Sequence, residues 1–264
     1  MNGLFKYFST DQDKLERFTK GEVYLTPPKY LNDPWDFRLR IEPPTDDFLR
    51  KQAPWLDPEG MAELRSLVST DDWLEKKAEE ELERLSKDHG LICLSEDPLD
   101  MLMWAHYGES HKGFVAQFKH SDAEAKKTAS VFPCCGSPFG PAAKVDYQPQ
   151  RPLLKLDQSN TEEVLQKNMM EVLLTKHLCW QYESEWRVIR PLSTGGQHPT
   201  KAGFVLAWFR PAYLLRVILG LRVSPEVRFQ LREMLNHSEF DHVRKEQMHI
   251  APDSRELKPR PWSW

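Results

Sequence analysis

The sequence predicts an α+β fold: a single domain over residues 1–264 with a central mixed or antiparallel sheet and a helical insertion around residues 44–90. Three observations predict it. Short segments of alternating or continuous apolar residues, typical of strands, recur along the chain. A few segments with apolar residues at helical spacing stand between them, without internal repeats or a long linker. The chain has 264 residues, 40% of them hydrophobic, which is enough to bury a sizeable core.

The N-terminal part predicts a strand, a helix and a second strand. Residues 4–8 have the apolar density of a short strand. Residues 9–11, Ser-Thr-Asp, are typical of a helix cap, and the helix is expected to run through Phe18. Gly21 ends it, as glycine often does just past a helix. Residues 22–26 then alternate like a strand.

The middle of the chain begins with the insertion at 44–90, which is acidic and rich in lysine. Its apolar residues at helical spacing, from Trp73 to Leu85, predict one or two helices with a solvated charged face. The segments that follow are a buried strand at 90–95, a short helix or turn at 101–108, a strand at 113–119, and a Pro/Gly-rich loop at 133–143.

The C-terminal part mixes strands and helices. The expected elements are a brief strand at 144–147, a helix at 161–177, a strand at 180–191, a loop at 192–199, strands at 203–209 and 216–220, a helix at 225–235, and an extended tail from Gln247.

Composition limits the partners. The net charge of -4 gives no global basic field for nucleic acid, so a nucleic-acid partner depends on a local basic groove. The start lacks the apolar segment of a signal peptide, and no window approaches a membrane span. The four cysteines, Cys93, Cys134, Cys135 and Cys179, form no CxxC pair. We therefore expect a cytoplasmic protein with free thiols, no membrane partner and no metal site.

Four clusters of polar and aromatic residues are candidates for chemistry. They are Lys6-Tyr7; Asn32-Asp33-Pro34 with Asp36; Trp104-Ala105-His106-Tyr107 with His111; and Tyr182 to Arg187. Each also has a structural interpretation. Lysine can flank a strand with its amine in water, Asn-Asp-Pro is a common turn, and the histidines can be satisfied at an interior edge.

The fourth cluster is the most informative. On a strand Glu183, Glu185 and Arg187 share one face, because side chains repeat every second residue. If this row is exposed to solvent, its ion pair contributes little to stability. The flanking aromatic and apolar residues favour partial burial instead, where two carboxylates repel each other and one becomes suited to act as a general base or to accept from a sugar hydroxyl. Arg187 would offset that charge or hold a phosphate, and His106 would share proton transfer.

The sequence resembles a widespread bacterial family of unknown function. The resemblance rests on four segments in fixed order: LFKYFS at 4–9, GEVYLTPPKYLNDPWD at 21–36, LICLSEDPLDMLMWAHYGESHKG at 91–113 and WQYESEWRVI at 180–189. They span nearly the whole chain. The sequence departs from the pattern at Phe8, where the first motif of the family often has arginine.

The order of these segments is also similar, more distantly, to the ADP-ribosyltransferase fold. The shared features are an opening strand, a helix, a second strand that begins with glycine, and a late Glu-x-Glu. This resemblance implies an NAD-consuming enzyme of the kind found in bacterial toxins and phage-defence effectors, acting on a macromolecular acceptor that the sequence does not name. In such enzymes the late glutamate stabilises an oxocarbenium-like transition state at the ribose.

Residue by residue, the resemblance implies that Glu185 is the catalytic acid and that Glu183 positions the acceptor, with His106 assisting. Lys6 stands where the first strand usually carries His or Arg. Trp104 or Tyr107 would stack on nicotinamide. The full set expected to bind NAD is Lys6, Tyr7, Asn32, Asp33, Trp104, Tyr107, His111 and Arg187.

Two other functions are open. One is a metal-dependent nuclease, in which Mg²⁺ would be held by acidic residues and a histidine. Its candidate residues are Asp33, Asp36, Glu183, Glu185 and His106. The other is a regulatory domain that binds a nucleotide-like small molecule without turnover, using the aromatic residues around the polar clusters. Those residues are Trp35, Trp104, Tyr107, Trp180 and Trp186.

Overall fold

The computed structural model describes residues 3–120, 139–155, 162–192, 205–254 and 256–262. The chain divides into two compact units. Unit 1 comprises residues 1–26, 90–144 and 181–264, and unit 2 comprises residues 27–89 and 145–180. Both units are assembled from segments far apart in the sequence. The single domain expected over residues 1–264 stays a prediction.

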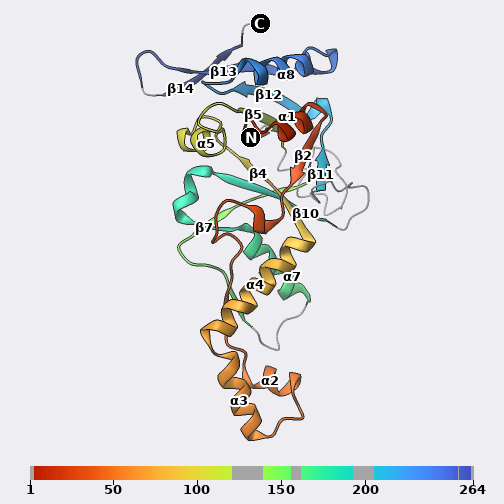
Figure 1. The fold of residues 1–264 in the computed structure, drawn as a ribbon, viewed down its shortest axis with the longest axis vertical. Coiled ribbons are helices and arrows are strands. Elements are labelled where there is room, and N and C mark those ends of the chain that lie inside the picture. The colour runs from red at the N-terminus through yellow and green to blue at the C-terminus, as the bar shows by residue number, and fades with distance from the viewer. Residues whose placement is uncertain (1–2, 121–138, 156–161, 193–204, 255, 263–264) are drawn as a thin grey trace. The chain divides into compact units, whose positions relative to one another are not determined.

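Unit 1 is built on an eight-stranded sheet, which confirms the predicted α+β class with a mixed central sheet (Figure 1). The strand order is β14 (Leu257–Pro261), β13 (Arg244–Ile250), β12 (Leu214–Leu219), β5 (Phe114–Lys119), β1 (Gly3–Phe8), β4 (His89–Ser95), β10 (Glu185–Pro191) and β6 (Ala142–Lys144). The sheet is mixed because β12 pairs with β13 in parallel, whereas β1 pairs with β5 antiparallel. A separate pair joins β2 (Glu22–Leu25) to β11 (Val205–Trp208).

Alternation along the strands gives the sheet two apolar faces. On β5, Phe114 and Phe118 enter the larger core cluster, whereas Val115 belongs to a second cluster with Trp104. Helices α1 (Gln12–Thr19) and α8 (Pro225–Leu235) contribute to the larger cluster, and α5 (Met101–His106) contributes Trp104 to the second. Helices α1 and α8 therefore pack on one face of the sheet, and the shorter helix α5 packs on the other.

Unit 2 contains the predicted helical insertion. It forms three helices rather than one or two: α2 (Asp46–Gln52), α3 (Pro58–Val68) and α4 (Asp71–Asp88). Each begins with a side-chain cap, from Thr45, Asp57 and Thr70 respectively. Pro54, just after the end of α2, cannot continue that helix, whereas Pro58 suits the first position of α3.

The rest of unit 2 is a helix and two short parallel strand pairs. Helix α7 (Glu162–Leu174) lies where a helix at 161–177 was predicted, although the last three of those residues form a strand. The strand pairs are β3 (Arg40–Glu42) with β8 (Leu153–Lys155), and β7 (Asp146–Gln148) with β9 (Thr175–His177). β3 and β8 were not predicted. The loops expected at 133–143 and 192–199 fall largely outside the described residues.

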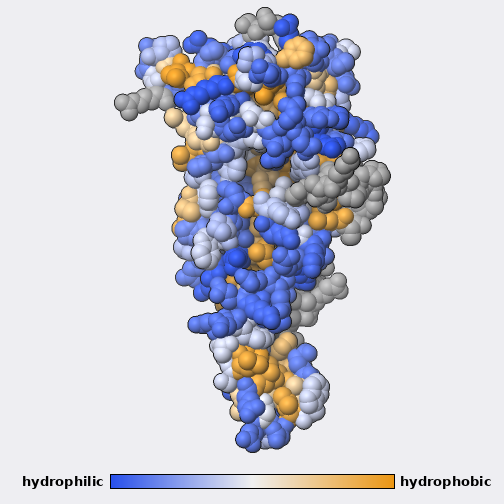
Figure 2. All heavy atoms as spheres, in the orientation of Figure 1, coloured by the Kyte–Doolittle hydropathy of each residue, from blue (hydrophilic) through white to orange (hydrophobic). Residues whose placement is uncertain are grey.

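Two surface properties bear on partners. Figure 2 shows hydrophobic residues on the surface of the α2–α3 region, where Trp55 and Leu67 are exposed. Such exposed apolar surface is often found where a protein meets a partner. Among the described residues, none of the helices combines the length and the apolarity that crossing a membrane requires.

Candidate functional site

The first candidate site is a group of four unit 1 residues, Tyr107, Glu183, Glu185 and Arg187, which we name the carboxylate cluster. Glu185 and Arg187 lie on β10, and two hydrogen bonds join the Arg187 guanidinium to the Glu185 carboxylate. Arg187 Nε donates to Glu185 Oε1 at 2.9 Å and Nη2 donates to Oε2 at 3.1 Å. Arg187 is 0% exposed and Glu185 is 3% exposed. The two side chains therefore form a buried, bidentate ion pair rather than a row of solvent-exposed charges.

Glu183 reaches the cluster from a different element than predicted. It ends the 3₁₀ helix Leu178–Glu183, and only Glu185 lies on the strand. Ser184 between them has a φ of 44°, in the left-handed region that non-glycine residues seldom adopt. The prediction that one strand runs through 180–191 with both carboxylates on one face is therefore wrong. A turn at Ser184, held by its N–H donating to Gln181 O at 3.2 Å, links the 3₁₀ helix that carries Glu183 to the strand that carries Glu185.

Tyr107 completes the cluster from the end of α5. Its hydroxyl donates to Glu183 Oε1 at 2.6 Å, and Glu183 is 2% exposed. His106 is exposed, with its ring 6.4 Å from that of Tyr182. The Tyr107–Glu183 hydrogen bond thus joins the third and fourth sequence clusters within unit 1, while His106 faces solvent.

Lys6 lies on the opposite face of the sheet from the buried ion pair. Leu4 and Phe8 belong to the larger core cluster, against which Trp186 also packs. Because Lys6 is two residues from both Leu4 and Phe8, its side chain points to the face of the sheet that holds this cluster. Glu185 is next to Trp186 on β10, so its side chain points to the opposite face. Burial lowers the pKa of Lys6. Burial also raises the pKa of the Cys93 thiol on neighbouring β4, and the Glu185 carboxylate adds to that effect.

Trp104 is a core residue. Its indole is 0% exposed, donates to Pro98 O at 2.8 Å and packs edge-on against Tyr7 at 5.4 Å. It therefore presents no surface on which nicotinamide would stack. Tyr7 donates to Asp97 O at 2.8 Å, and burial raises its pKa, so its hydroxyl remains a donor. Both residues serve the architecture in this structure.

The motif that follows Trp104 is an unusual loop. Glu109, Ser110 and His111 have φ values of 48°, 55° and 68°, three consecutive left-handed residues without a glycine among them. The loop is tied to its surroundings through Glu109, which accepts from the Thr10 N–H at 2.8 Å, and through Gly113, whose carbonyl accepts from Gly220 N–H at 2.9 Å. Burial, and then Arg222, lowers the pKa of His111.

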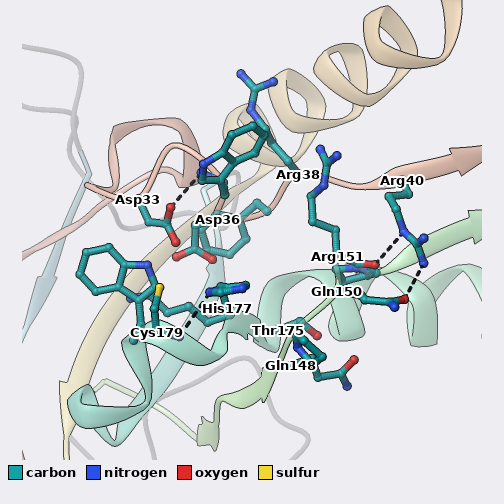
Figure 3. A pocket seen from close by; sticks show the side chains of 16 residues that line it. Asp33, Asp36, Arg38, Arg40, Gln148, Gln150, Arg151, Thr175, His177 and Cys179 are labelled. Atoms are coloured by element: carbon teal, nitrogen blue, oxygen red, sulfur yellow. Dashed lines mark hydrogen bonds between the residues drawn. The ribbon is translucent and has the colours of Figure 1, made fainter. Parts of the chain in front are cut away.

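The second candidate site is a cavity of about 530 Å³ in unit 2, which we name the tryptophan–arginine cavity (Figure 3). It lies among the loop after Pro28–Tyr30, strand β9 and the segments beside β7 and β8. Its aromatic and charged lining residues are Trp35, Phe37, Trp180, Asp33, Asp36, Arg38, Arg40, Arg151, Lys176 and His177.

Two cations that line this cavity lie over its tryptophan rings. The Arg151 guanidinium lies 5.3 Å from the Trp35 ring centre, and the Lys176 amine lies 5.1 Å from that of Trp180. Arg40 is fixed by donating to Arg151 O at 3.3 Å and to Gln150 Oε1 at 3.4 Å. The cavity therefore offers flat apolar surfaces next to oriented positive charge.

The structure distributes the predicted site residues over both units. Unit 1 holds most of them: Lys6, Tyr7, Trp104, His106, Tyr107, His111, Glu183, Glu185 and Arg187. Unit 2 holds Asn32, which is exposed, and Asp33, which is buried and lines the cavity. Sequence reasoning missed the cavity cations. The available signal was their interleaving with aromatic residues in WDFRLR at 35–40 and KHLCW at 176–180.

Within the described part of the chain, no three His, Cys, Asp or Glu side chains are placed to hold one metal ion. The acids proposed for a nuclease are divided between the units, with Asp33 and Asp36 in unit 2 and Glu183 and Glu185 in unit 1. The geometry thus adds nothing in favour of a metal-dependent nuclease.

Comparison with known proteins agrees with the predicted family. Residues 103–188 match the family described as Protein of unknown function (DUF2971). The matched DUF2971 region begins inside the MWAHYG motif and ends in the EWRV strand, so it contains the whole carboxylate cluster. No curated protein and no solved structure matches the chain. The resemblance to ADP-ribosyltransferases gains no support from these comparisons.

Proposed function

We propose that this protein binds a nucleotide-like anion in the tryptophan–arginine cavity. The observation that carries the proposal is the lining of the cavity. Three arginines and a lysine outnumber two aspartates, and two tryptophans stand among them. A volume of about 530 Å³ falls within the range of cavities that enclose small organic ligands. This is the binding function without turnover that the sequence leaves open as an alternative to an enzyme.

The chemistry of the lining fits the parts of a nucleotide. A guanidinium presents a planar fork of N–H donors that matches two phosphate oxygens. An indole face binds a base by stacking, and a cation beside it adds electrostatic attraction. Arg151 lies next to Trp35 and therefore combines both features at one point of the cavity.

Replacement of Arg151 by methionine tests this proposal. We expect ADP, ADP-ribose or NAD to bind the native protein and to bind Arg151→Met about tenfold to a hundredfold more weakly, because charge-assisted hydrogen bonds to phosphate are lost. Isothermal titration calorimetry measures both affinities. Arg84→Met, on the exposed face of α4 and away from the cavity lining, is the matched control and should bind like the native protein. Equal binding by both variants, or no binding of any of the three nucleotides, would contradict the proposal.

A second candidate is cleavage of NAD at the carboxylate cluster, in the cytoplasm and with an ADP-ribosyl acceptor still to be identified. The favouring observation is that Arg187 holds the Glu185 carboxylate in one orientation through two hydrogen bonds. A fixed carboxylate suits a cation that forms at the ribose as the glycosidic bond breaks and nicotinamide leaves. A role as a toxin or phage-defence effector goes with this candidate alone.

The cleavage candidate predicts that native protein releases nicotinamide from NAD and that Glu185→Gln loses this activity at least about a hundredfold. Chromatography of the reaction mixture measures the release. Circular dichroism must show that the variant remains folded at the assay temperature, because Glu185 is also half of a buried ion pair. Glu233→Gln, an exposed residue on α8, should keep full activity. Absence of release by the native protein would remove the candidate.

A further inference from the structure

The segment of unit 2 that runs from Asn32 to Arg38 contains a strained residue and supplies side chains to the cavity. The Asp33 carboxylate accepts from the Trp35 N–H at 2.9 Å, and the Arg38 N–H donates to Trp35 O at 3.3 Å. Between them Phe37, a bulky residue that is 2% exposed, has a φ of 63°. Left-handed conformations of such residues cost free energy and concentrate at functional sites. Here the tight turn directs Asp33, Trp35 and Arg38 to the same cavity.

The cavity is polarised. Figure 3 shows the carboxylates of Asp33 and Asp36 on one side and the guanidinium of Arg40 on the other. Phosphate groups are repelled by carboxylates and attracted by guanidinium groups, so they are expected on the arginine side. The part of a nucleotide that faces Asp33 must then be neutral and must donate hydrogen bonds.

We propose that Asp33 binds the ribose hydroxyls, so that the cavity selects ribonucleotides over 2′-deoxyribonucleotides; this rests on the proposed function. An ionised carboxylate only accepts hydrogen bonds, and it offers about four acceptor positions. Trp35 N–H uses one of these, which leaves acceptor capacity on Asp33 for the neighbouring 2′- and 3′-hydroxyls. Asp33 is 6% exposed, so these bonds would form away from bulk water, where a missing donor is costly.

Titration of the native protein with ADP, 2′-deoxy-ADP and inorganic pyrophosphate tests the inference. We expect ADP to bind at least about tenfold more tightly than 2′-deoxy-ADP, since the deoxy compound leaves a buried acceptor without its donor. Asp33→Asn is the informative variant. Its amide oxygen can still accept from Trp35 N–H and preserve the turn, while its NH₂ group replaces an acceptor with a donor. This variant should bind ADP and 2′-deoxy-ADP within about threefold of each other and pyrophosphate as the native protein does.

The outcomes separate the two proposals. Equal affinity of the native protein for ADP and 2′-deoxy-ADP, or an unchanged preference in Asp33→Asn, overturns the ribose inference and leaves nucleotide binding intact. Failure of both nucleotides to bind the native protein overturns nucleotide binding and the ribose inference with it. Loss of pyrophosphate binding in Asp33→Asn also overturns the inference, because the aspartate would then shape the whole cavity rather than contact the sugar.

Discussion

Replacement of Arg187 by methionine is expected to lower the free energy of unfolding by about 3–5 kcal/mol. The guanidinium is 0% exposed and binds both oxygens of Glu185, which is itself 3% exposed. Methionine fills part of the vacated space but leaves the Glu185 carboxylate buried without its countercharge. A buried charge without a partner lowers the free energy of unfolding by far more than the intact ion pair contributes to it. Urea denaturation followed by circular dichroism measures the change.

The control for this prediction is an ion pair of the same chemistry in solvent. Arg84 Nη2 and Glu81 Oε2 on α4 lie 2.7 Å apart, with both side chains at least partly exposed. Arg84→Met should therefore cost about 1 kcal/mol or less. The double variant Arg187→Met with Glu185→Leu should recover much of the stability lost by Arg187→Met, since neither charge of the pair remains. A loss from Arg187→Met as small as that from Arg84→Met would show that water reaches Glu185.

The carboxylate cluster shows how far sequence alone reaches. Alternation correctly predicts that Glu185 and Arg187 share a face, because β10 is a regular strand there. The same rule fails for Glu183 since a single left-handed residue, Ser184, separates a 3₁₀ helix from the strand. A positive φ at a serine has no local signature, because it is imposed by the surrounding structure, here with Ser184 O accepting from Glu96 N–H at 3.1 Å.

The cavity could not be predicted from local sequence patterns, for a different reason. Its walls depend on strand pairs only three residues long, in which Arg40 pairs with Leu153 and Gln148 pairs with His177. Strands of three residues are too short to show a hydrophobic periodicity, and their pairing partners lie far away in the sequence. Several strands of the eight-stranded sheet, by contrast, carry enough alternation to be predicted individually, as Phe114–Lys119 shows, whereas β13 was not predicted. The cations of the cavity become a site only once these pairings are known.

The loop from Gly108 to Gly113 leads to the second large effect. A Cβ on Gly113 would lie 1.9 Å from the carbonyl oxygen of Phe8, which is backbone and cannot move aside as a side chain does. Gly113→Ala must therefore push β1 away from the start of β5, at the centre of the eight-stranded sheet. We expect a loss of at least about 3 kcal/mol of unfolding free energy, at or above the upper range for overpacked cores. Urea denaturation again measures it.

Gly60 on α3 provides the matched control for Gly113. A Cβ there would meet the flexible side chain of Asp57 at 3.2 Å, and the position is helical. Gly60→Ala should therefore be neutral or stabilise by up to about 1 kcal/mol, because alanine favours a helix over glycine. If Gly113→Ala were tolerated equally well, Phe8 and Gly113 would not approach as closely as the structure has them. The glycine that ends the HYGESHKG motif would then need an explanation other than backbone contact.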